Sequence, residues 1–146
     1  MTERKDKDLA FMLRYENVAW YQDGEVRILD RRVYPAAVRF EICKTHQEVA
    51  KAIADMVTQS AGPYSAAAMG MALAAHECRD MSAEKQMEYL GNAAVTLSTA
   101  RPTTRARMEQ VTERALGAAK LAIASGEKAE DAVFAAAIAA NESRYS

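Results

Sequence analysis

Hydrophobic and polar residues alternate in the first third of the chain, and this pattern predicts β-strands. Residues 15–29 contain two β-favouring runs, YENVAWY and EVRIL. Asp23 and Gly24, between them, suit the positive φ angles of a tight turn, so we predict a β-hairpin. In residues 38–43, Val38, Phe40 and Ile42 alternate with charged residues, which predicts a third strand. Together the runs predict a small three-stranded antiparallel sheet.

From Thr45 onward the apolar residues recur at helical spacing. Thr45 and Glu48 form the pattern of a capping box, so a first helix is expected to begin there and to end between Ser60 and Gly62. Four more helices are expected at residues 63–78, 82–98, 103–126 and 127–141. The helix at residues 63–78 is rich in alanine, so its neighbours can pack closely against it. The predicted fold class is α+β: a small sheet followed by a bundle of about five helices.

Length and charge narrow the class of protein. A chain of 146 residues that is half hydrophobic suits one compact domain, so we expect a single domain over residues 1–146. Nineteen basic and twenty acidic residues leave a net charge of −1, which gives no general attraction to nucleic acid or to anionic membranes. No apolar stretch is long enough to cross a bilayer, and the N-terminus lacks the pattern of a secretion signal. A cytoplasmic protein without membrane or nucleic-acid partners is expected.

Cysteines and histidines give little sign of a metal or redox site. Cys43 and Cys78 are far apart and form no CxxC pair, so buried free thiols are expected. His46 reads as an exposed residue in the first turn of a helix. His76 has acidic and thiol neighbours, but adjacent helix positions point in different directions and cannot converge on one ion. We therefore expect no metal and no cofactor.

A group of basic residues and a group of aromatic residues could each bind a ligand, but both are better explained by structural roles. The basic group could contact RNA or an acidic partner, but interleaved glutamates favour a solvated face with salt bridges. The aromatic group is expected to join the sheet to the helices. The basic group is Arg101, Arg105, Arg107 and Arg114, and the aromatic group is Trp20, Tyr21 and Phe40.

Four stretches of the sequence resemble one known family. ILDRRVYP (residues 28–35) and EICKTHQEVAKAIADMV (residues 41–57) are similar to the motifs "LDQR.LP" and "CKT.EEVA.AI..MV", in the same order and spacing. SAAAMGMALAA (residues 65–75) and ARPTT (residues 100–104) extend the similarity. The chain thus resembles the N-terminal domain of the methylthioribose-1-phosphate isomerases. Their superfamily includes ribose-1,5-bisphosphate isomerases and regulatory subunits of initiation factor 2B.

The resemblance implies a fold and indicates which domain of the family carries the catalytic residues. In the isomerases a small antiparallel sheet and helices precede a Rossmann-like domain, which carries the catalytic cysteine and aspartate. The sequence shows no such domain, so we expect no catalytic residue in this chain. We expect a naturally short chain; the alternative is a piece of a longer protein. Activity would need a sugar phosphate and a separate Rossmann-like chain, or a homo-oligomer.

The resemblance also implies candidate substrate-binding residues. Arg101 matches the arginine of the family's "RPT" motif, and a guanidinium there can bind phosphate through two hydrogen bonds. The alternative is a helix-capping or surface arginine. The family's "RGAP.IG" loop corresponds to TQSAGPYS (residues 58–65), which lacks the arginine. Ser60 and Ser65, with the N–H groups near Pro63, could form an anion site, or the segment could be a simple turn between helices.

Two functions follow from these expectations. The first is an isomerase-like domain of methionine salvage that completes a sugar-phosphate site only with a partner. The second is a non-catalytic regulatory or oligomerisation module related to initiation factor 2B subunits. Its alanine-rich helices would serve for self-association.

Overall fold

The computed structural model describes residues 18–34, 36–59 and 62–144. A three-stranded antiparallel sheet in the order β1-β2-β3 is followed by five α-helices, which confirms the predicted α+β class. The strands are β1 (Ala19–Gln22), β2 (Glu25–Leu29) and β3 (Phe40–Cys43). The helices are α2 (His46–Ala54), α3 (Gly62–Glu77), α4 (Ala83–Ser98), α5 (Arg105–Ala124) and α6 (Ala129–Arg144), with a 3₁₀ turn η2 (Pro102–Thr104) before α5.

The hairpin of β1 and β2 forms at the predicted turn. Gln22 pairs with Glu25, and Asp23 and Gly24 between them have φ angles of 50° and 83°. A β-carbon on Gly24 would lie only 2.9 Å from Nε2 of His76 in α3. Glycine is therefore needed both for the backbone conformation and for the close approach of the turn to α3. The first predicted hairpin residues, 15–17, lie outside the described ranges.

Replacing Gly24 by alanine tests this double requirement. The strained φ and the displaced His76 ring should together lower the free energy of unfolding by about 2 kcal/mol, measured by urea denaturation. Gly126→Ala is the matched control, because Gly126 also has a positive φ of 75° but open space around its would-be β-carbon. It should cost about 1 kcal/mol, from the backbone strain alone. Equal losses would show that contact with His76 does not matter.

The third strand begins later than predicted, at Phe40 rather than Val38. Cys43 pairs with the buried Val26 and shares its inward side, whereas Ile42 pairs with Arg27 and is 46% exposed. The apolar alternation seen in the sequence is thus real, but it marks the outer face of the sheet. The Arg27 guanidinium lies 4.4 Å from the centre of the Phe40 ring on that side.

The cap of α2 is confirmed, but its predicted end is wrong. Thr45 Oγ1 accepts a hydrogen bond from the Glu48 N–H at 3.2 Å, as a capping box requires. The helix ends at Ala54 instead of continuing to Ser60–Gly62. Met56 takes a left-handed φ of 64°, and the Val57 N–H bonds back to the Ala52 carbonyl. Val57, directly after this tight ending, is buried.

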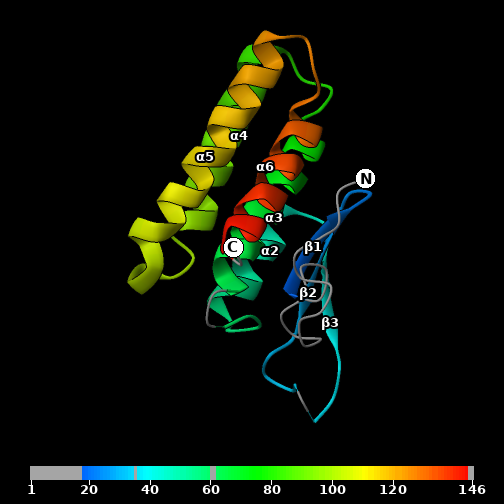
Figure 1. Ribbon diagram of the computed structural model, residues 1–146, viewed down its shortest axis with the longest axis vertical. Helices are drawn as coiled ribbons and strands as arrows, with labels where there is room; N and C mark the ends of the chain where they lie inside the picture. Colours follow the sequence, from blue (N-terminus) through cyan, green and yellow to red (C-terminus); the bar gives the residue numbers. More distant parts are fainter. Residues whose placement is uncertain (1–17, 35, 60–61, 145–146) are drawn as a thin grey trace.

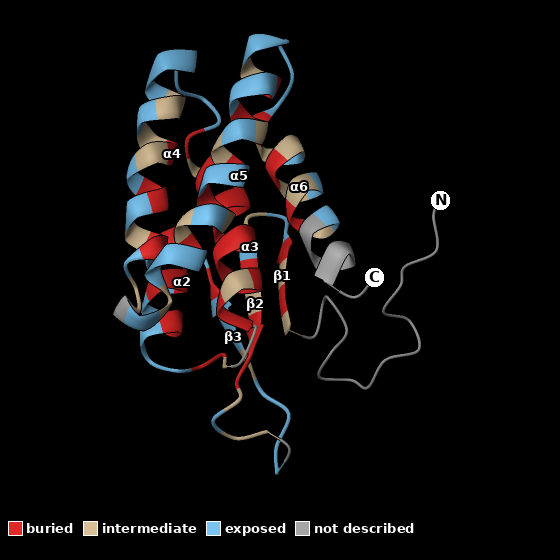
Figure 2. Ribbon diagram, turned by 60° about the vertical axis from the view of Figure 1, so that its left-hand side comes forward, coloured by how far each residue is buried: buried red, intermediate tan, exposed pale blue. Residues whose placement is uncertain are grey.

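The central element is α3, which packs against the sheet and against all four other helices. Figure 2 shows α3 almost entirely in the colour of buried residues, while α4 and α5 are pale blue on their outer sides. Small side chains permit this, as expected: a β-carbon on Gly70 would lie 3.1 Å from both Leu97 and Val49. The Ser82 cap of α4 is also confirmed by its bond from the Lys85 N–H. None of the helices in the described part is both long and apolar enough to span a membrane.

Candidate functional site

Arg101, the arginine of the RPT motif, lies in the turn between α4 and η2. Its Nε–H donates to the carbonyl of Ile53 at 2.7 Å, and Nη2 donates to the carbonyl of Thr58 at 2.6 Å. The guanidinium therefore joins the last turn of α2 to the loop that leads into α3. These two bonds use two of its five N–H donors. The half-buried arginine has the capping role that was the alternative to phosphate binding, and it also stands beside the predicted loop.

That loop is packed tightly against the start of α3. Thr58 is buried, and a β-carbon on Gly62 would lie 1.8 Å from Thr58 Oγ1, so only glycine fits there. Pro63 occupies the first turn of α3, as predicted. Ser65 follows in the same turn and is buried. Ser60, the other predicted hydroxyl, lies outside the described residues. The structure thus brings Arg101 to the loop but places Ser65 inside the fold.

A second arginine reaches the same corner and was missed as a site residue. The Arg107 guanidinium, from the first turn of α5, lies 4.7 Å from the centre of the Tyr64 ring in the first turn of α3. The first turn of α3 carries no acidic side chain. The sequence predicts a solvated face with salt bridges for this group of arginines. Arg105 fits that prediction, since it pairs with Glu109 at 2.7 Å, whereas Arg107 packs on Tyr64. We call Arg101, Arg107, Tyr64 and the start of α3 the α3 corner.

A buried polar cluster joins α2, α3 and α4. His46 is 4% exposed, so the expectation of an exposed first-turn residue is wrong. Its backbone N–H and its Nδ1 lie 2.8 and 2.6 Å from the Glu77 carboxylate, and the Tyr89 hydroxyl donates to the same carboxylate at 2.7 Å. Burial raises the pKa of Glu77, but these three hydrogen bonds outweigh it and hold the pKa below its usual value. The partners are 12 and 31 positions away in the chain, so local spacing gave no signal.

A second polar cluster joins the hairpin to the helices. The Tyr21 hydroxyl donates to the Glu130 carboxylate of α6, and His76 Nδ1 lies 3.0 Å from the same oxygen. Burial and the Glu130 carboxylate both raise the pKa of Tyr21. Glu130 also borders an open surface cleft of about 410 Å³, lined by both acidic and basic side chains: Arg79, Asp80, Glu127 and Lys128. This mixed lining favours no particular charge of ligand.

The cysteines are buried free thiols, as predicted. Burial, together with the nearby Glu48 and Glu41, raises the pKa of Cys43 to about 12, and burial raises the pKa of Cys78. Neither thiol is suited to act as a nucleophile near neutral pH. Within residues 18–34, 36–59 and 62–144, no three His, Cys, Asp or Glu side chains gather closely enough to hold a metal ion.

Comparison with known proteins supports the resemblance seen in the sequence. No protein-family model matches the chain. Over 84 residues it is 37% identical to the methylthioribose-1-phosphate isomerase of Caldanaerobacter subterraneus and 39% identical to that of Natranaerobius thermophilus. Each match covers 57% of this chain and 24% of the relative. The similarity thus spans about a quarter of the length of these enzymes.

Two crystal structures share the fold over most of the chain. The translation initiation factor eIF-2B subunit delta from A. fulgidus superposes with a TM-score of 0.68 and 29% identity, over 87% of this chain and 36% of that one. The 5-methylthioribose 1-phosphate isomerase from Pyrococcus horikoshii superposes with a TM-score of 0.66 and 22% identity, over 88% and 35% of the two chains. The second match shows the fold alone. Sequence and structure together confirm similarity to the suspected superfamily.

Proposed function

From its similarity to the superfamily of methylthioribose-1-phosphate isomerases and initiation factor 2B subunits, we propose that the chain is a sugar-phosphate-binding module. Its α3 corner binds the phosphate, and a separate Rossmann-like domain or chain supplies the groups that react. The main support is that Arg101 and Arg107 both approach the N-terminus of α3, whose first turn has no acidic residue. A helix N-terminus and guanidinium groups both favour an anion.

The same corner supports a binding role rather than catalysis by this chain alone. Interconversion of an aldose and a ketose requires a group that removes a proton from carbon and returns it. Arginine stays protonated and serves poorly as a base, and the tyrosine hydroxyl of the corner is a weak base near neutral pH. A partner domain or chain would therefore provide the acid and base, while this module would hold the charged end of the substrate.

Calorimetric titration with methylthioribose-1-phosphate and with ribose-1,5-bisphosphate tests the proposal. Arg107→Ala should weaken binding about tenfold, because one charge-assisted contact is worth roughly 1.5 kcal/mol or more. Arg105→Ala is the matched control, since Arg105 lies two positions away on α5 and pairs with Glu109. Its affinity should stay near that of the wild type. Absence of binding by the wild type at millimolar ligand would contradict the proposal.

A second function, a regulatory or assembly module, is favoured by a different observation. The structure of eIF-2B subunit delta matches 87% of this chain at 29% identity, whereas the isomerase structure matches a similar share, 88%, at only 22% identity. Arg101 also bonds to two backbone carbonyls, a role that needs no ligand. A wild-type protein that binds neither sugar phosphate but associates with another protein would support this alternative.

A further inference from the structure

The outward face of α5 has a composition that this fold does not explain. Gly117 lies in the middle of the 20-residue helix, and apart from its chain neighbours and the nearby helix backbone, no atom of the described residues is within 4 Å of where its β-carbon would be. Glycine destabilises a helix interior relative to alanine, and here nothing inside the described part requires it. Four residues further on, Leu121 is 73% exposed. Gly117 leaves room for another helix to approach α5 closely, and the exposed Leu121 offers an apolar side chain for it to contact.

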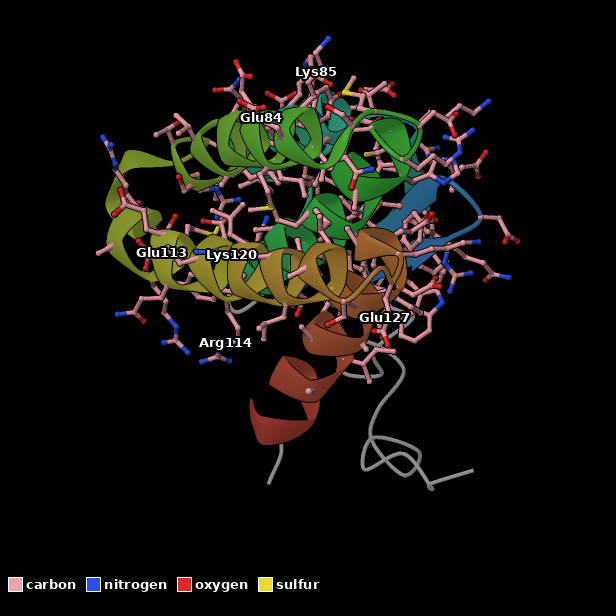
Figure 3. All side chains as sticks on the ribbon, turned by 90° about the horizontal axis from the view of Figure 1, so that it is seen from above. Glu84, Lys85, Glu113, Arg114, Lys120 and Glu127 are labelled. Atoms are coloured by element: carbon pink, nitrogen blue, oxygen red, sulfur yellow. The ribbon has the colours of Figure 1, made fainter. Side chains whose placement is uncertain are left out.

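An acidic and a basic residue lie on either side of Gly117 on one face of α5, so this face could pair with a second copy of itself. Glu113 and Lys120 are exposed and stand four positions before and three positions after it. At about 100° per residue, all three lie within roughly 60° of one another around the helix. Figure 3 shows Glu113, Arg114 and Lys120 along α5. The structure records no ion pair for Glu113 or Lys120 with any described residue.

A hollow lies on the side of α5 where Leu121 projects. It measures about 30 Å³ and is lined mainly by apolar atoms of α3, α5 and α6. Arg114, on its rim, is seven positions before Leu121 and therefore lies on the same side of α5. The α5 and α6 residues of the lining are Val111, Arg114, Ala115, Val133, Ala136 and Ala137.

We propose that two copies of this chain associate through α5, in antiparallel orientation about a two-fold axis that passes midway between Glu113 and Lys120, next to Gly117. Residues at equal distances on either side of the axis then face each other. Glu113 faces the partner's Lys120, and Lys120 faces the partner's Glu113, so two identical ion pairs flank the crossing point. Gly117 lets the helices approach closely. Leu121 of each copy lies beside Val111 and Arg114 of the other, at the mouth of the hollow.

The other described glycine that lies within a helix and has open space lacks these features. Gly91 of α4 also has open space where a β-carbon would stand. The residues four positions before it and three positions after it are Met87 and Ala94, which carry no charge. The self-complementary arrangement is therefore a property of α5, and the proposal is independent of the sugar-phosphate function. It assigns this face of the helix to a second copy of the chain.

Charge reversal provides the sharpest test, with the dimer dissociation constant measured by sedimentation equilibrium of the full chain. Glu113→Lys alone and Lys120→Glu alone each place like charges in contact twice, so each should weaken dimerisation at least about tenfold. The double variant restores both pairs with inverted polarity and should return to within about threefold of the wild type. A double variant no better than the single ones would overturn the proposed pairing, as would a wild type that remains monomeric at high-micromolar concentration.

Substitutions at the crossing point separate association from folding. Gly117→Gln should abolish the dimer by holding the helices apart, while the melting temperature of the monomer stays equal or rises by a few degrees. Leu121→Gln should weaken the dimer at least about fivefold. Val95→Gln is the control, because Val95 is 59% exposed on α4, outside the proposed interface. If Val95→Gln lowered dimer affinity as much as Leu121→Gln did, or Gly117→Gln left the dimer intact, α5 would not be the interface.

Discussion

Replacing Glu77 by alanine is expected to lower the free energy of unfolding by about 3–5 kcal/mol, the range found when one partner of a buried ionic network is removed. The carboxylate accepts hydrogen bonds from the His46 backbone, the His46 ring and the Tyr89 hydroxyl. Without it, these donors from α2 and α4 remain in the interior with no acceptor. Urea denaturation measures the loss. Glu88→Ala, at an exposed position of α4, is the control and should change stability by less than about 0.5 kcal/mol.

The Glu77 carboxylate should also make the free energy of unfolding depend on pH in the acidic range. Its pKa in the folded state lies below the 4.5 of a free glutamate, so the unfolded chain takes up this proton first. The stabilisation is therefore complete above pH 4.5 and is lost as the pH falls through the lower, folded-state pKa. The difference in unfolding free energy between wild type and Glu77→Gln should shrink in that window. A difference that stayed constant from neutral pH to strong acid would contradict the assignment.

Arg101→Ala should cost about 2–4 kcal/mol of stability, whether or not the chain binds a sugar phosphate. Two hydrogen bonds from a charged donor are lost, and the Ile53 and Thr58 carbonyls lose their partner at the junction of α2 and α3. Thermal and urea unfolding measure the effect. Arg105→Ala removes an arginine whose ion pair is largely exposed and should cost under about 1 kcal/mol. Equal effects of the two substitutions would show that Arg101 does not brace the loop.

This result bears directly on how the RPT arginine is interpreted. If Arg101 were only a ligand-binding residue, alanine would abolish binding and leave stability unchanged. The geometry instead predicts loss of both, because the loop before α3 depends on the same guanidinium that stands beside the proposed phosphate site. For this reason Arg107, which packs on Tyr64 and has no hydrogen bond to the described residues of that loop, is the better position to substitute for a binding measurement.

Local sequence signals predicted most of the elements. Asp23 and Gly24 marked the hairpin turn because positive φ is intrinsic to those residue types, and Thr45 and Ser82 marked helix starts because their hydroxyls cap nearby N–H groups. The end of α2 was missed. It depends on Val57 turning into the core, a long-range packing effect that helical spacing cannot reveal.

The candidate site was predicted less completely. Family motifs indicated Arg101, but its bonds to Ile53 and Thr58 connect positions 48 and 43 residues apart. The contact between Arg107 and Tyr64 likewise joins the starts of two helices, α5 and α3. The sequence predicts an exposed His46 because first-turn positions are usually exposed, whereas its partner, Glu77, comes from the far end of α3. Such tertiary pairings require knowledge of which helices are neighbours.

The burial of α3 on all sides has a consequence for how the sequence can change over time. In most amphipathic helices the solvent side accepts nearly any substitution, and the core side suffers chiefly from loss of volume. In α3 the most destabilising substitutions should be those that add volume. An added methyl group at Ala66, Ala72 or Ala74 would push against neighbouring elements that already touch the helix. In a saturation mutagenesis experiment, α3 should therefore form the least tolerant stretch of the chain, with serine and glycine the best accepted replacements for its alanines.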